Sequence, residues 1–212
     1  MYLGEQTLGE VARTVPGATA VFHDYQLNFC CGGDQTVRQA AESRGVDVQT
    51  LVSRLEQLRM EHGPGPEQHE METKELIAEI RTRHQYLLKE QLPELIRLAR
   101  KVESVHARHP DCPAGLALLL TTMEQELREH MHKEDRVFSL VADGTDQSSP
   151  ASLSTLRDEH EQQGENLRTM EGLTGDIVPP ERACPTWQAL YTGLRQLRRD
   201  LMDDLHLENN VL

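Results

Sequence analysis

The fold is decided by the stretch Glu124–Glu134, which reads EQELREHMHKE. Apart from its two histidines, every residue in this stretch is a strong helix former. His130 and Glu134 are four residues apart, so both project from one face of the predicted helix. His132 is two residues from His130 and points roughly the opposite way, towards the surface. The stretch therefore presents an imidazole and a carboxylate together on one side of a long helix.

Similar helix-forming sequence extends in both directions from this stretch. Four long helices are predicted, at about 72–106, 113–142, 150–173 and from 185 to the end of the chain. Pro93 lies inside the first of them and predicts a local kink or break. Short connections between long amphipathic helices make them antiparallel neighbours. The second part of the chain is therefore predicted to be an antiparallel, up-down-up-down four-helix bundle in an all-α protein.

The first 60 residues have shorter helical signals. Thr7 and Glu10 form a capping box, and Thr36 and Asp47 can cap two later helices. Two glycines and two prolines alternate in Gly63–Pro66, which a helix cannot continue through. The sequence thus predicts a small helical domain at 1–60, a linker at 61–70 and the bundle at 71–212.

Composition argues against several classes of partner. The formal net charge of −13 repels nucleic acid and anionic membrane surfaces. The most apolar run, Leu116–Leu120, is too short to span a bilayer, and the first residues lack the pattern of a secretory signal. Adjacent Cys30 and Cys31 are poor disulfide partners for each other. A reducing, cytoplasmic location is therefore expected.

Ligand-type side chains fall at matching heights on all four predicted helices. His130 and Glu134 lie about ten residues before the end of their helix, and His160 lies about ten after the start of the next, so a rise of ~1.5 Å per residue brings them level. His84 reaches the same layer, and on the last helix Asp204 and Glu208 repeat the spacing of four. Imidazoles and carboxylates that project inward from four helices make a dinuclear metal site. Iron is the expected metal, with manganese and zinc as alternatives.

Several motifs along the whole chain resemble one known family. They are Phe29–Gly33, Glu90–Leu95, Lys101–His106, His130–Glu134, Glu159–Glu161 and Leu207–Leu212. In these motifs the sequence is similar to the hemerythrin-like di-iron proteins called repair of iron centres. That resemblance implies a hemerythrin-like four-helix bundle preceded by a small helical domain.

The resemblance also implies a ligand set. Terminal ligands would be His84, His130 and His160, and bridging carboxylates would be Glu134 and Glu208. The family has a fourth terminal histidine at the position of Asp204, which either ligates metal in its place or leaves that position open. The implied cofactor is two non-haem iron ions with oxo and carboxylate bridges.

The function implied is the repair of iron–sulfur clusters damaged by nitric oxide or oxidative stress. Iron donation, nitric oxide reduction to nitrous oxide, or both would carry it, and nothing in the sequence chooses between them. Nitric oxide reductase activity, and hence whether the protein is an enzyme, stays open. Small ligands would be nitric oxide or dioxygen, iron–sulfur proteins would be the repair clients, and the chain would be a monomer or a homodimer.

Cys30 and Cys31 are the candidate catalytic residues outside the bundle. Their alternative interpretation is a packed pair beside the Gly32–Gly33 turn. Two rival functions are a hemerythrin-like dioxygen or nitric oxide sensor or carrier without catalysis, and a structural bundle whose metal site has decayed at Asp204. The attached Cys-Cys domain favours repair, because a pure carrier needs no second module that bears thiols.

Overall fold

The chain is helical throughout the part that the structure describes. The computed structural model describes residues 2–27, 29, 33–62, 73–142 and 150–210, so Cys30 and Cys31 lie outside the described residues. These ranges contain no strand, and the predicted all-α class is confirmed. None of the helices in them has an apolar stretch long enough to cross a bilayer. Contacts divide the chain into two compact units, one of Met1–Thr73 with Leu201–Leu212 and one of Lys74–Asp200.

The first unit contains short helices whose ends follow from the sequence. They are the 3-10 turn η1 (Leu3–Glu5), α1 (Leu8–Thr14), α2 (Ala18–Asp24), α3 (Val37–Ser43) and α4 (Val48–His62). Thr7 and Thr36 each make a complete capping box, at the starts of α1 and α3. Asp47 accepts the Thr50 backbone N–H at 2.8 Å and so caps α4. Fully buried apolar side chains hold these helices together, among them Leu8, Val11, Phe22, Phe29, Leu51 and Leu55.

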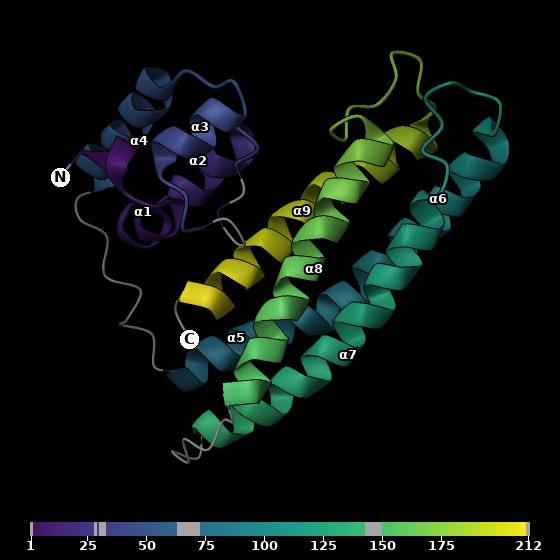
Figure 1. The fold of residues 1–212 in the computed structure, drawn as a ribbon. Coiled ribbons are helices and arrows are strands. Elements are labelled where there is room, and N and C mark those ends of the chain that lie inside the picture. The colour runs from purple at the N-terminus through teal and green to yellow at the C-terminus, as the bar shows by residue number, and fades with distance from the viewer. Residues whose placement is uncertain (1, 28, 30–32, 63–72, 143–149, 211–212) are drawn as a thin grey trace. The chain divides into compact units, whose positions relative to one another are not determined.

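The second unit is the helical bundle (Figure 1). Its helices are α5 (Thr73–Tyr86), α6 (Leu92–His106), α7 (Leu116–Ala142), α8 (Pro150–Thr174) and the start of α9 (Pro185–Asn210). Apolar side chains from facing helices are almost wholly inaccessible and form its core, including Ile80, Leu95, Leu120, Leu127, Leu167, Leu190 and Leu194. A Cβ at Gly193 of α9 would lie 2.6 Å from Leu95 Cδ2, so the missing side chain lets α9 approach α6 closely.

A π-helical segment, η3 (Leu87–Gln91), joins α5 to α6. The Leu92 N–H donates to the carbonyl of Leu87, five residues back, in place of the usual four. Pro93 follows and has no N–H with which to continue the ordinary α-helical pattern. The break expected near Pro93 therefore takes the form of a π-bulge directly before it, and the first long helix continues beyond.

Candidate metal centre

Four side chains from three helices of the bundle meet in its interior. His84 comes from the last turn of α5, His130 and Glu134 come from α7, and His160 comes from α8. Their exposed fractions are 8%, 3%, 2% and 6%, so each side chain is buried. Burying this many titratable groups is costly unless they satisfy one another or a cation. All four were predicted site residues, and the structure brings them together.

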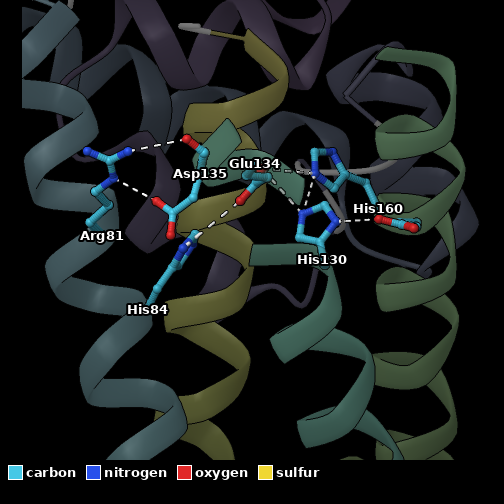
Figure 2. Close-up of polar contacts among 7 residues, drawn as sticks. Arg81, His84, His130, Glu134, Asp135 and His160 are labelled. Atoms are coloured by element: carbon cyan, nitrogen blue, oxygen red, sulfur yellow. Dashed lines mark hydrogen bonds and ion pairs between the residues drawn. The ribbon is translucent and has the colours of Figure 1, made fainter. Parts of the chain in front are cut away.

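The Glu134 carboxylate lies between the imidazoles (Figure 2). Its Oε1 is 3.3 Å from His130 Nε2 and 3.8 Å from His160 Nε2. Its Oε2 faces the other way, 4.0 Å from His84 Nδ1. The ligand atoms of His130, Glu134 and His160 all lie within 4.8 Å of one another. One oxygen thus faces a pair of histidines and the other faces a different histidine, which is the arrangement expected of a carboxylate between two metal ions.

The chemistry of this donor set fits a cation. Burial opposes ionisation of Glu134, but contacts with the imidazoles of His130, His160 and His84 outweigh it and lower the pKa of Glu134 to about 2. The carboxylate is therefore an anion, and its buried Oε2 has no hydrogen-bond partner among the described residues. His130 Nε2 and His160 Nε2 face each other at 3.1 Å, so at most one proton fits between two lone pairs. Hard and intermediate cations such as iron accept this mixture of imidazole and carboxylate.

Glu159 orients one of the histidines. Its Oε2 lies 2.8 Å from His130 Nδ1, and its Oε1 accepts a hydrogen bond from Lys133. Burial raises the pKa of Glu159, but the contacts with Lys133 and His130 outweigh this, and the net pKa is lowered. A carboxylate on Nδ1 fixes the tautomer that leaves the Nε2 lone pair directed at the centre. The sequence alone does not predict this role of Glu159, and its position directly before His160 is the one local signal for it.

A solvent-facing cavity of about 600 Å³ reaches His84 from outside the bundle. Arg81, which pairs with Asp135 at 2.7 Å, lies on its wall beside His84 (Figure 2). His132 also lines this cavity and is exposed, as its spacing from His130 predicts. Small molecules can therefore approach the centre along the side of His84.

The remaining predicted ligands lie on the last turns of α9, in the part assigned to the first compact unit. Asp204 is 3% exposed and Glu208 is half-buried. His206, between them in sequence, is buried with its ring 5.6 Å from that of Phe29, and burial lowers the pKa of His206 to about 4. The metal-binding roles of Asp204 and Glu208 stay predictions, as do the roles of Cys30 and Cys31.

Residues 75–212 match the hemerythrin HHE cation binding domain. The chain belongs to the hemerythrin HHE family. The match covers the bundle and therefore includes His84, His130, Glu134 and His160. Residues 4–59 match a second domain family, the domain of unknown function DUF542.

Several relatives align with this hemerythrin HHE protein over nearly their whole length. The iron-sulfur cluster repair protein YtfE of Dickeya chrysanthemi is 42% identical over 213 residues, which cover 100% of this chain and 96% of that protein. The proteins of the same name from Pectobacterium atrosepticum and Yersinia pestis (strain Angola) are 41% and 39% identical, over 98% of this chain and 95% and 94% of theirs. The resemblance recognised in the sequence is confirmed.

Proposed function

We propose that this protein repairs damaged iron–sulfur clusters by means of two iron ions bound in its bundle. The observation that carries the proposal is the buried Glu134 carboxylate, whose two oxygens face different histidines. Membership of a cation-binding family supports metal binding at this place, and the relatives named for iron–sulfur cluster repair support the role. The same names favour repair over a simple dioxygen or nitric oxide carrier.

We assign the ligands as follows. His130 and His160 would hold one iron, His84 would hold the other, and Glu134 would be a ligand of both. The family resemblance implies Glu208 as a further carboxylate ligand, and Asp204 occupies the position at which that family has its fourth terminal histidine. When bound, ferrous iron would supply the chemistry that binds nitric oxide or dioxygen, and it would also be the metal that a damaged cluster needs.

The chain's own groups contribute binding, orientation and release. Oxygen and nitrogen ligands hold iron less tightly than the thiolates of an iron–sulfur protein, so iron can pass to a client. Glu159 holds the tautomer of His130, and the cavity beside His84 admits small ligands. We place the protein in the cytoplasm, because both described cysteines, Cys112 and Cys184, are free and thiols persist in reducing compartments.

Cys30 and Cys31 are proposed to support the reaction without holding the iron. Two adjacent thiols beside Gly32 and Gly33 form a reactive pair that can pass iron or electrons to a client. Their part in repair is separable from metal binding, because every histidine assigned to the centre lies on a bundle helix.

Metal analysis combined with a repair assay tests the proposal. We expect about two iron ions per chain, and reactivation of an iron–sulfur protein whose cluster nitric oxide has damaged. Glu134→Gln removes the bridging charge and should lose at least one iron and most repair activity, whereas Glu129→Gln, at an exposed position of the same helix, should change neither. A Glu134→Gln protein that folds and keeps both irons would contradict the assignment.

The cysteine pair is tested in the same assay. Replacing Cys30 and Cys31 with Ser should leave the iron content intact and lower the repair rate. Cys112→Ser serves as the matched control and should repair at the normal rate. Normal repair by the double variant would return the pair to a packing role.

A further inference from the structure

Cys184 and His106 form a close pair at one end of the bundle, away from the metal centre. His106 is the last residue of α6, and Cys184 directly precedes Pro185, the first residue of α9. Cys184 Sγ lies 3.2 Å from His106 Nε2, within hydrogen-bonding distance for sulfur. Both side chains are half-buried, and the thiol is free. A half-buried nucleophilic side chain thus lies against a group able to exchange its proton.

Aromatic packing holds the imidazole in this position. The His106 ring lies 4.8 Å from the ring of Trp187, which is 1% exposed. The ring of His109 packs edge-on against the same indole at 5.3 Å. Trp187 is three residues after Cys184, so the first turn of α9 positions both the thiol and the support for its partner. The contact between sulfur and imidazole is therefore set by the buried core of this end of the bundle.

The pair also lies at a helix N-terminus. The Cys184 carbonyl accepts a hydrogen bond from the Gln188 N–H at 3.0 Å, which places Cys184 at the N-cap position of the 26-residue helix α9. Helix N-termini carry a partial positive charge from backbone N–H groups, which favours an anion there. The thiol thus lies at a helix N-terminus as well as against an imidazole.

This cluster is separate from the metal ligands. His106 is 22 residues after His84 along the first long helix, or roughly 33 Å at 1.5 Å per residue. Nothing in metal binding or in the proposed repair reaction uses Cys184, His106 or Trp187.

We propose that Cys184 is a peroxide-reactive thiol, with His106 as its acid–base partner and hydrogen peroxide or a small organic hydroperoxide as the oxidant. The thiol proton passes to His106 Nε2, and the thiolate sulfur attacks the nearer peroxide oxygen. The S–O bond forms as the O–O bond breaks, and the imidazolium proton goes to the departing oxygen. With hydrogen peroxide the products are a sulfenic acid on Cys184, a neutral His106 and one water molecule. The sulfur is oxidised by two electrons and the peroxide is reduced by two.

Cys112 provides a matched comparison within the same molecule. It is also free and half-buried, and it precedes a proline near the start of α7. Burial and the charge of Glu103 raise the pKa of Cys112, which leaves less of the reactive thiolate at neutral pH. Two cysteines of similar exposure therefore differ in whether an imidazole contacts the sulfur.

The test exposes the full-length protein to hydrogen peroxide with a dione that traps sulfenic acids, and quantifies each cysteine peptide by mass spectrometry. Cys184 should be labelled at least about tenfold faster than Cys112. His106→Gln keeps a polar side chain but cannot take up the proton. It should therefore slow the labelling of Cys184 about tenfold and leave the labelling rate of Cys112 unchanged. Alkylation by iodoacetamide, which needs neither iron nor peroxide, should give the same order of rates.

Equal rates for Cys184 and Cys112 in the unmodified protein would overturn the proposal, even if His106→Gln failed to fold. A folded His106→Gln protein with an unchanged Cys184 rate would overturn the role of the imidazole. Iron content and repair should be normal in His106→Gln, so a failure here is distinguishable from a failure of the proposed repair function.

Discussion

Glu159 shows how one residue outside the ligand set can govern the affinity of a metal centre. Its carboxylate holds His130 Nδ1 at 2.8 Å and is itself held by Lys133. Without this contact the imidazole can rotate or change tautomer, and its Nε2 lone pair is no longer fixed on the centre. The sequence identified His130 and Glu134 because spacing along one helix is a local pattern. It did not identify Glu159, whose role depends on a contact with a residue 29 positions away on another helix.

Glu159→Ala is therefore expected to weaken iron binding by about 10–100-fold without unfolding the bundle. Competition with a ferrous chelator measures the affinity. Glu161→Ala is the control, because Glu161 flanks His160 on the other side and is exposed. Equal losses of iron affinity in the two variants would point to a general effect of removing negative charge. Unchanged iron affinity in Glu159→Ala would mean that other contacts orient His130.

Asp204 occupies the position where the resembling family has a histidine. It lies one turn before Glu208 on the same face of α9 and is buried. Asp is shorter than His and anionic, so it reaches less far towards a metal and stabilises the ferric state more than an imidazole would.

Asp204→His should raise the share of chains that retain two irons and raise the reduction potential of the centre. Metal analysis and a redox titration measure the two quantities. Arg199→Gln is the control, because Arg199 is an exposed residue of the same helix and should change neither quantity. If Asp204→His changes neither quantity, the ligand face of α9 has been assigned in the wrong register.

At the scale of elements, the sequence predicted the long helices of the bundle closely and their irregularity only in part. The third was expected at about 150–173 and α8 is Pro150–Thr174, because Pro150 marks its start and Gly175, followed by Pro179 and Pro180, marks its end. Pro93 predicted a kink or break, and the structure has the π-segment Leu87–Gln91. A proline removes one N–H, but whether the helix bends, ends or widens depends on how the neighbouring helices pack against it.

At the scale of the whole molecule, α9 takes part in both compact units. Its residues up to Asp200 belong to the bundle, and those from Leu201 onwards belong with the first unit. His23 Nε2 lies 3.2 Å from Asp203 Oδ1, across 180 residues of sequence. The alternating glycines and prolines of the sequence predicted a linker at 61–70. They could not predict the contact between His23 and Asp203, because a local sequence pattern shows which face of a helix is buried but not which distant residue it meets.

The stability of the first unit should therefore determine how firmly the last turns of α9, which carry Asp204 and Glu208, are held in place. Phe29 is fully buried and packs against Phe22 at 5.6 Å, His23 at 5.2 Å and His206 at 5.6 Å. Phe29→Ala removes this ring and should destabilise the first unit by about 3 kcal/mol. The last turns of α9 would lose a packing partner, so a ligand contributed by Glu208 would be held less firmly.

Phe29→Ala is accordingly expected to lower both the melting temperature and the affinity for iron, although no residue near position 29 is an assigned ligand. Thermal unfolding of the metal-free protein and chelator competition measure the two effects separately. Tyr86→Ala is the matched control, because Tyr86 is an aromatic residue of the bundle that is 59% exposed, and it should change neither quantity. A Phe29→Ala protein that melts earlier but binds iron normally would show that α9 holds its ligands without help from the first unit, and Glu208 would then have to be positioned by the bundle alone.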